Sequence, residues 1–428
     1  MRIITDLHLH SKYSRACSKE LTLPNIAKAC ERKGIQMVGT SDFTHPAWRA
    51  HIGEALIEAG EGTFRLADDS SATSFILATE LSSIYKRNDK TRRVHNLVLF
   101  PDLSSVDRFI AALEVRGANL KSDGRPILGI DSEDLLKMVL DASTNGLLIP
   151  AHAWTPWFSV FGSQSGFDAL GECFGEMTKH IHAIETGLSS DPAMNRRLSA
   201  LDDVLLVSNS DAHSPDKLGR EANVFEMERP SYVELRRILV ERDTSKFIET
   251  IEFFPEEGKY HADGHRACRY WCLPEETKKR KGVCPKCGKP LTVGVLSRVA
   301  ELADRAPDPS VAKARGPSVP PRFAPGHSGQ AQIRAAVPYR SIVPLAELVG
   351  AVLDVGASSK KVAKIVADLV TDGRTEFGVL LDDPEAVLSS AAPPNVVAAI
   401  LAMRRGEVTV RPGYDGEYGQ IQLNVGKK

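Results

Sequence analysis

Histidine and carboxylate side chains recur along the first half of this chain, in most cases directly after a short apolar run. The candidate metal ligands and proton carriers are Asp6, His8, His10, Asp42, Glu80, His95, His152, Glu185, Asp211 and His213. His8 and His10 are separated by one residue, so on a strand their side chains point to the same face. Asp211 and His213 repeat this spacing much later in the chain. We therefore expect these residues to converge on one site.

This mixture of imidazole and carboxylate ligands indicates a class of reaction. Such mixed ligands suit Zn²⁺, Mn²⁺ or Fe²⁺, whereas an all-oxygen cage suits Mg²⁺ or Ca²⁺. Two cations ~3.5–4 Å apart, bridged by a carboxylate, can hold both oxygens of an in-line phosphoryl displacement and generate hydroxide from bound water. The alternative is that the histidines are structural, but buried imidazoles need polar partners, which metal coordination provides for all of them. We predict metal-dependent phosphoester hydrolysis.

Seven apolar runs between residue 1 and about residue 225 predict the strands that position these side chains. Helical patterns alternate with the runs, as in βα architectures. In a parallel barrel, catalytic side chains come from the carboxyl ends of several strands. Chemically active residues follow every run except the fourth, where His95 stands at the start instead. The runs comprise residues 2–4, 37–39, 75–77, 97–99, 147–149, 182–184 and 204–207.

This combination of motifs resembles the PHP (polymerase and histidinol phosphatase) superfamily over residues 1 to about 225. The resemblance implies an α/β fold with a distorted seven-stranded β/α barrel, and two or three divalent cations (Zn²⁺, Mn²⁺, Mg²⁺ or Fe²⁺) as cofactors. One metal would be bound by His8, His10, Glu80 and Asp211, and a second by Glu80, His95 and His152, with Glu80 bridging. His213 would belong to a third site. Asp211, Glu80, His8 and His10 would then be the catalytic residues.

Two positions depart from the superfamily pattern, and both concern the third metal. The carboxylate that usually follows the first motif is replaced around Arg15. The usual Thr-Asp-His reads Ser41-Asp42-Phe43, and a histidine follows only at His45. We predict His45 as the replacement ligand.

Four cysteines in the second half of the chain predict a separate zinc site. Cys268 and Cys272 are separated by three residues, and Cys284 and Cys287 by two. These two pairs fit a tetrahedral four-cysteine zinc ribbon with one structural Zn²⁺, whereas the alternative is four unrelated thiols. The basic run at residues 278–281 lies between the pairs, which favours a surface that contacts a phosphate backbone.

The aromatic residues after His152 have two possible interpretations. Trp154, Trp157, Phe158 and Phe161 could form a hydrophobic lid that packs on the barrel rim. They could instead stack on a base that has been taken out of the duplex.

Barrel, ribbon and helical tail together resemble one branch of the superfamily, the endonuclease Q family, over nearly the whole chain. The motifs that carry this resemblance are residues 11–15, 42–46, 84–85, 155–158 and 209–214, together with the ribbon. It implies cleavage of damaged DNA on the 5′ side of hypoxanthine, uracil, xanthine and abasic sites. A donor facing the new carbonyl and an acceptor facing the new ring N–H would read uracil and hypoxanthine alike. We expect substrate contacts from Tyr13, Arg15, Tyr85, Trp154, Trp157 and Phe158.

Two other functions stay open at this point. A phosphatase of a small phosphorylated metabolite would need the barrel but neither the ribbon nor the basic run. A non-catalytic DNA-binding module would need no intact ligand set, so the complete series of histidines and carboxylates argues against it.

The composition limits which binding partners and which cellular compartment we expect. Lys and Arg number 54 against 55 Asp and Glu, so any nucleic-acid surface must be local. No apolar stretch has the length of a membrane span, and the first residues leave no room for a signal peptide. We expect a cytoplasmic protein with no membrane partner. Its segments would be the barrel (1–255), the ribbon (256–306), a flexible Pro/Ala/Arg-rich linker (307–337) and a mainly helical domain (338–428).

Overall fold

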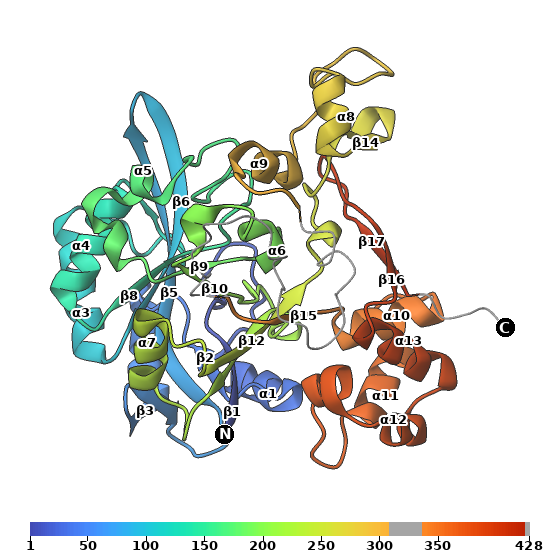
Figure 1. Cartoon of the computed structure of the whole chain (residues 1–428). Coiled ribbons are helices and arrows are strands. Elements are labelled where there is room, and N and C mark those ends of the chain that lie inside the picture. Colours follow the sequence, from blue (N-terminus) through green and yellow to red (C-terminus); the bar gives the residue numbers. More distant parts are fainter. Residues whose placement is uncertain (308–335, 424–428) are drawn as a thin grey trace.

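The computed structural model of the protein describes residues 1–307 and 336–423. Its fold is mixed α/β, as the sequence predicts, with helices packed around a central mixed sheet of 11 strands (Figure 1). The strands of this sheet are β1 (Arg2–Asp6), β2 (Met37–Gly39), β3 (Leu56–Gly60), β4 (Thr63–Leu66), β5 (Ser74–Arg87), β6 (Lys90–Phe100), β7 (Ile127–Leu128), β8 (Leu147–Pro150), β11 (Ala222–Glu226), β12 (Phe247–Phe253) and β15 (Tyr339–Ile342).

All seven apolar runs overlap strands. Five of them form β1, β2, β5, β6 and β8, and the other two form a separate parallel pair, β9 (Ala183–Glu185) and β10 (Leu205–Val207). Strands β1, β2 and β5 are parallel, but β6 runs antiparallel to both β5 and β8. An isolated parallel bridge joins Leu9, after β1, to Ala212, after β10. The pairing is therefore mixed rather than all-parallel, and a seven-stranded barrel stays a prediction.

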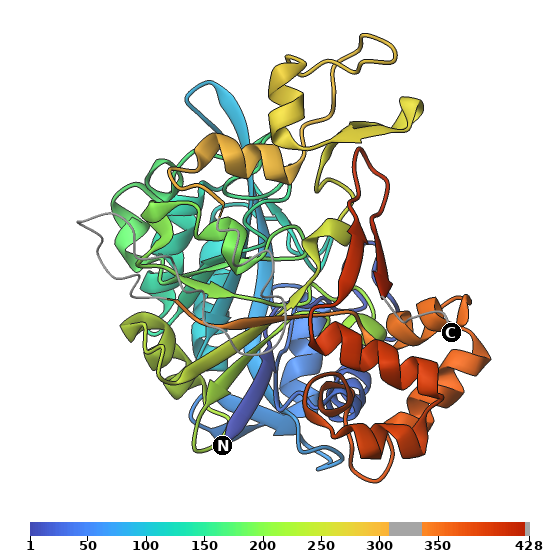
Figure 2. The ribbon, with the colours of Figure 1, turned by 45° about the vertical axis from the view of Figure 1, so that its right-hand side comes forward.

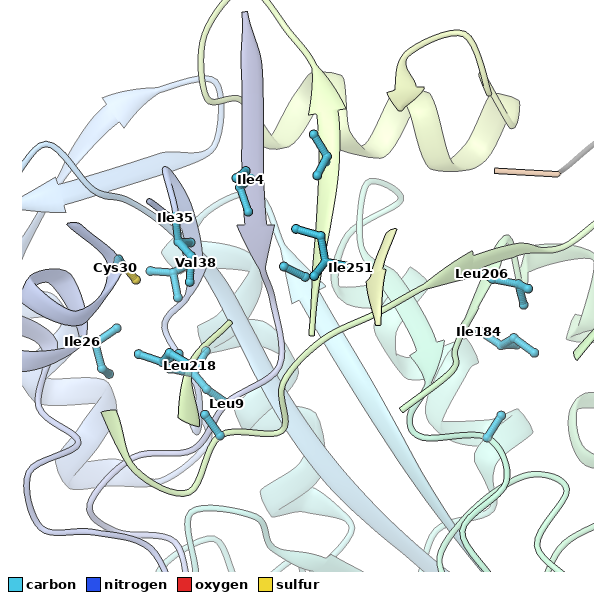
Figure 3. Close-up of a cluster of buried hydrophobic side chains, with 14 of the residues drawn as sticks. Ile4, Leu9, Ile26, Cys30, Ile35, Val38, Ile184, Leu206, Leu218 and Ile251 are labelled. Atoms are coloured by element: carbon cyan, nitrogen blue, oxygen red, sulfur yellow. The ribbon is translucent and has the colours of Figure 1, made fainter. Parts of the chain in front are cut away.

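Helix α1 (Leu23–Lys33) shows how the helices are fixed to the sheet. Pro24 stands in its first turn, where the missing N–H costs nothing. Gly34 ends it with a φ of +85°, which glycine adopts without strain. Its buried side chains Ile26 and Cys30 lie beside Val38 of β2 (Figure 3). The other α-helices of the first 307 residues are α2 (Pro46–Ala55), α3 (Leu103–Val115), α4 (Ser132–Ala142), α5 (Leu170–Phe174), α6 (Pro192–Asn195), α7 (Tyr232–Glu241), α8 (Pro274–Lys279) and α9 (Val295–Leu302).

The C-terminal helices pack against the end of α1. Lys33 donates a hydrogen bond of 3.0 Å to Glu376, and both side chains are buried. A Cβ on Gly34 would lie 2.6 Å from Oγ1 of Thr375, so the contact requires glycine. The elements of this part are α10 (Leu345–Leu353), α11 (Lys360–Leu369), a π-helix (Gly378–Asp382), α12 (Glu385–Ala391), α13 (Pro394–Arg404) and the antiparallel pair β16 (Val408–Arg411) and β17 (Gln420–Leu423).

The structure bears on two predicted segments, the helical C-terminal domain and the linker that precedes it. Strand β15 pairs in parallel with β12, so residues 339–342 extend the main sheet, and the domain bounds stay a prediction. Most of the predicted linker, at residues 307–337, lies outside the described residues. Within the ranges that the structure describes, no helix is both long and apolar enough to cross a membrane.

Candidate metal centre

Glu80 lies at the centre of the candidate site and faces two groups of histidines. Its Oε2 atom is 3.4 Å from Nε2 of His8 and 3.3 Å from Nε2 of His10. Its Oε1 atom is 2.6 Å from Nδ1 of His95 and 3.1 Å from Nε2 of His152. The two oxygens of one carboxylate therefore point toward two different sets of imidazole nitrogens.

Asp211 completes the first set. Its Oδ1 atom is 3.0 Å from Nε2 of His10 and 3.7 Å from Nε2 of His8. The ligand atoms of these two histidines, Glu80 and Asp211 all lie within 4.8 Å of one another, as do those of the second set. The structure thus brings together both ligand sets that the PHP resemblance implies: His8, His10, Glu80 and Asp211, and Glu80, His95 and His152.

A buried nitrogen without a hydrogen bond shows that a cation fits the first set. Nε2 of His8 is fully buried and makes no hydrogen bond to any described residue. Its nearest polar neighbours are the carboxylate oxygens of Glu80 and Asp211, which lie at 3.4 and 3.7 Å. A buried polar atom without a partner is costly, and a divalent cation between these three groups would satisfy it.

Several of these residues have strained backbones, which is common at functional sites. Asp211 has a φ of +46° and His152 a φ of +30°, both in the left-handed region. The loop after β9 permits the conformation of His152, because a Cβ on Gly187 would lie 2.5 Å from the Cβ of His152. Glycine at position 187 is therefore required for this approach.

Two further carboxylates orient the histidines from behind. Glu185 lies 3.0 Å from Nδ1 of His8 and accepts hydrogen bonds from the backbone N–H of His152 at 2.7 Å and from Nδ2 of Asn209 at 2.9 Å. Contacts of this kind fix the ring orientation and the tautomer of a ligating histidine. The sequence indicated Glu185 as a candidate site residue but did not reveal that it orients His8.

Asp42 has the same relation to His10. Its Oδ1 atom is 3.4 Å from Nδ1 of His10, and its Oδ2 atom accepts hydrogen bonds from the hydroxyls of Ser11 and Ser14 at 2.6 and 2.7 Å. A Cβ on Gly124 would lie 2.2 Å from the same oxygen. Asp42 is thus saturated by protein contacts and holds His10 in place.

The electrostatics favour ionised carboxylates at the centre. Burial alone raises the pKa of Glu80, but the charges of His95, Arg125 and His8 lower it, so the net pKa lies well below the usual range. The pKa of Asp211 is also lowered, because its contacts with His10 and His8 outweigh its burial. Both groups are therefore anionic and ready to bind cations.

Arg125 is a functional candidate that the sequence did not reveal. Its Nη1 atom donates a hydrogen bond of 2.9 Å to Oε2 of Glu80. It comes from the loop before β7, and no motif marks that loop in the sequence. A guanidinium at the metal centre is well suited to bind phosphate oxygens.

The antiparallel direction of β6 explains why His95 precedes its apolar run. In the β5–β6 pair, His95 is opposite Ser82, and Glu80 is opposite Leu97. His95 and Glu80 lie midway along their strands, two ladder positions apart on the same face of the hairpin. A histidine that precedes the apolar part of an antiparallel strand thus reaches the site that histidines after parallel strands also reach.

The residues predicted for the third metal form no further group of three ligands in the described part of the chain. Nδ1 of His213 lies 2.8 Å from the backbone oxygen of Asp211, and its ring is 4.6 Å from that of His10, so it is beside the first set but outside it. His45 belongs to neither set, because it precedes α2 and its ring stacks on Tyr13 at 4.4 Å. Arg15 is exposed and donates its backbone N–H to Asp123.

The predicted substrate contacts divide into packed and accessible residues. Trp154 is 1% exposed and donates its indole N–H to Asn195 at 2.7 Å, so it is a core residue. Tyr85 is partly buried, and its hydroxyl lies 3.8 Å from Sγ of Cys173. Trp154 is therefore corrected to a structural role, whereas a substrate contact from Tyr85 stays a prediction. Trp157 and Tyr13 remain accessible, at 39% and 36% exposed.

Phe158 is an aromatic residue that contacts a candidate ligand of the metal centre. Its ring lies 4.8 Å from that of His95, and its backbone oxygen accepts the N–H of the same histidine at 3.0 Å. Its φ of +64° is exceptional for a bulky side chain. The chain therefore holds this ring beside a candidate ligand at a conformational cost.

The ribbon differs from the expected set of four cysteines. Sγ atoms of Cys268, Cys284 and Cys287 form one group of potential ligands, but the fourth member is His265 and not Cys272. Nδ1 of His265 lies 3.3 Å from Sγ of Cys287. Cys272 is buried, and its Sγ atom is 3.2 Å from Oγ1 of Thr277.

Strand geometry explains this correction. His265 ends β13 (Asp263–His265) and is opposite Tyr270, which begins β14 (Tyr270–Cys272), so both flank the turn that contains Cys268. Cys272 lies two residues farther along β14, about 7 Å away from that turn. The sequence contained the relevant signal, because His265-x2-Cys268 has the same spacing as Cys284-x2-Cys287.

Comparisons with known proteins show the family of this chain. The family described as the MJ0043 C-terminal domain matches residues 344–407. The uncharacterized protein YqxK of Bacillus subtilis is 30% identical over 98% of this chain and 99% of its own length. The crystal structure of the lesion-specific endonuclease PfuEndoQ from Pyrococcus furiosus is 31% identical, with a TM-score of 0.82 over 99% of this chain and 96% of that one. A structure of endonuclease Q with a 27-mer duplex that has an abasic lesion at its active site is also 31% identical, with a TM-score of 0.81 over 99% of this chain and 97% of that one. The chain belongs to the endonuclease Q family.

Proposed function

We propose that this protein is a metal-dependent endonuclease that hydrolyses the DNA backbone on the 5′ side of deaminated bases (hypoxanthine, uracil, xanthine) and of abasic sites. The observation that carries the proposal is the position of Glu80, with one oxygen facing each of two ligand sets, in a chain similar to endonuclease Q over nearly its full length. The DNA in the related complex contains an abasic lesion, which supports damaged DNA as the substrate here.

The chain's own residues would bind the cations and hold the substrate phosphate. When bound, divalent cations supply hydroxide from water and neutralise the charge of the scissile phosphate. Glu185 and Asp42 keep the ligating imidazoles in fixed orientations through the contacts described above. Arg125 adds a fixed positive charge beside Glu80 and would bind a non-bridging phosphate oxygen.

Recognition of the lesion must involve the base, because the backbone phosphates of damaged and normal nucleotides are identical. An enzyme acting on one base extrudes it from the duplex and stacks it on aromatic side chains. Trp157 is accessible, and the next residue, Phe158, contacts a candidate ligand. A base stacked on these two rings would leave its own phosphate within reach of the metal centre.

The experiment that tests the proposal uses duplexes that each contain one uracil, hypoxanthine, xanthine or abasic site. They are incubated with Mg²⁺, Mn²⁺ or Zn²⁺, with an undamaged duplex as the control, and the cut position is mapped on a sequencing gel. We expect one cut on the 5′ side of each lesion and none in the control. Hydrolysis of a small phosphomonoester, with every lesion duplex intact, would instead support the phosphatase alternative.

The ribbon would hold one structural zinc ion. We propose His265, Cys268, Cys284 and Cys287 as its ligands, because their ligand atoms lie within 4.8 Å of one another. A site with one imidazole and three thiolates is common for structural zinc. The cationic residues at 278–281 are exposed in this segment, which supports a contact with the DNA backbone.

A further inference from the structure

Strands β5 and β6 form a long hairpin that connects the metal centre to the surface. The last pair between β6 and β8 is Asn96 with Pro150. Beyond it, β5 and β6 stay paired with each other up to a tight turn at Asn88 and Asp89. Figures 1 and 2 show this hairpin projecting on the same side of the molecule as the zinc-ribbon segment that contains α8. Its base contains the candidate ligands Glu80 and His95.

The two faces of the hairpin have different partners. Side chains alternate along each strand, and residues paired across the ladder point to the same face. The metal-facing side, which we call face A, contains Glu80, Ser82, Ile84 and Lys86 of β5 with Thr91, Arg93, His95 and Leu97 of β6. The opposite side, face B, contains Leu81, Ser83, Tyr85 and Arg87 with Lys90, Arg92, Val94 and Asn96.

Two arginines of face B are engaged by the protein itself. Arg87 forms ion pairs with Asp131 at 2.9 Å and with Glu133 at 3.1 Å. Arg92 donates to the backbone oxygen of Gly166, and its guanidinium lies over the ring of Phe167, 4.2 Å from its centroid. These cations anchor the hairpin to the body of the molecule.

Unlike Arg87, the cations of face A form no ion pair within the described residues. Lys86 is exposed, and neither Lys86 nor Arg93 forms an ion pair with any residue in the described parts of the chain. Arg93 lies two residues before His95, and its guanidinium is 5.9 Å from the ring centroid of Phe158. From Glu80 to the turn, face A contains no carboxylate after Glu80 itself.

We propose that face A of this hairpin, through Arg93 and Lys86, binds the phosphate backbone of the duplex that flanks the cleavage site. The inference rests on the proposed function and adds the surface that positions the duplex. Lys86 lies six residues beyond Glu80 in β5, about 20 Å along the strand, a length that spans about six base pairs of B-DNA. Arg93 would hold the phosphate nearer the metals and Lys86 one farther out.

Salt dependence of binding tests this assignment. Each lost phosphate contact lowers the slope of log K against log salt by about one. The double variant Lys86→Ala/Arg93→Ala should therefore lose about two units of slope and bind a fluorescent uracil-containing duplex at least about tenfold more weakly at low salt. The measurement is fluorescence anisotropy over a series of KCl concentrations.

Lys90→Ala is the matched control. Lys90 is an exposed lysine close to the same turn, but it lies on face B. We expect its slope and affinity to equal those of the unmodified protein. The charge-preserving variant Lys86→Arg/Arg93→Lys should retain the full slope, which separates loss of charge from loss of folding.

The outcomes distinguish this inference from the proposed function. If the unmodified protein cuts lesion duplexes but the alanine double variant keeps its salt slope, or if Lys90→Ala loses as much as the double variant, the inference is wrong and the proposed function stands. If the unmodified protein neither binds nor cuts any lesion duplex, the proposed function fails, and the inference fails with it.

Discussion

Glu80→Gln is the substitution that most directly tests the shared metal centre. The change preserves size but removes the charge and replaces one acceptor oxygen with an NH₂ donor. In the structure both oxygens are used, since Oε1 lies 2.6 Å from His95 and Oε2 lies 3.3 Å from His10. Whichever way the amide turns, one ligand set meets a donor where a cation needs an acceptor.

The expected loss of cleavage rate follows from the loss of a metal ion, because Glu80 faces both ligand sets. A metal ion contributes several kcal/mol of transition-state stabilisation, and about 4 kcal/mol corresponds to about a thousandfold in rate. We therefore expect Glu80→Gln to retain at most one of the two proposed metals of this centre, measured by plasma mass spectrometry of the purified protein. Its single-turnover cleavage of an abasic duplex should fall at least about a thousandfold.

Glu221→Gln provides the matched control for this prediction. Glu221 is also fully buried, but burial and the nearby charges of Glu252 and Glu185 raise the pKa of its carboxyl well above the usual range. Its surroundings therefore disfavour the charged form, and glutamine should replace it with little effect on metal content or rate. Full metal content and near-normal cleavage in Glu80→Gln would refute the bridging role.

Three further substitutions test the rest of the site. Asp211→Ala should abolish cleavage but leave duplex binding within a few-fold in an anisotropy assay, because it removes a metal ligand and leaves Lys86 and Arg93 in place; normal turnover would exclude Asp211. His265→Ala should release the ribbon zinc, whereas Cys272→Ser should keep it, as a colorimetric zinc assay would show; the reverse result would restore the four-cysteine site. Trp157→Ala should slow cleavage at uracil by about ten- to a hundredfold, from stacking worth ~1–3 kcal/mol, but much less at an abasic site, and equal losses would assign Trp157 to packing.

The strands were predictable from the sequence, but the direction of one was not recognised. Each apolar run is a local pattern, and all seven overlap strands. The direction of β6 depends on the turn that precedes it, where Asn88 and Asp89 both have positive φ values of +52° and +56°. Two such residues between strands favour a type I′ hairpin, so the dipeptide contained a signal for the antiparallel pair.

The two ligand sets were predictable in part because each motif is short and contiguous. Glu185 and Arg125 contact the site but could not be assigned to it from any sequence motif. Glu185 orients His8 from 177 positions away, and Arg125 reaches Glu80 from a loop 45 positions away. No spacing rule links such residues, because their contacts exist only after strands distant in sequence have packed together.

The accessible and packed aromatic residues separate for the same reason. Trp154 and Trp157 are three positions apart and identical in type, yet one is 1% exposed and the other 39%. In the core, Asn195 of α6 accepts the indole N–H of Trp154, and the ring of Phe161 packs against the same indole. Phe158 then takes a left-handed backbone conformation that places its ring against His95. A segment that pays this conformational cost beside a candidate ligand, while its neighbour Trp157 stays in contact with solvent, is better suited to hold a substrate base than to close a barrel rim.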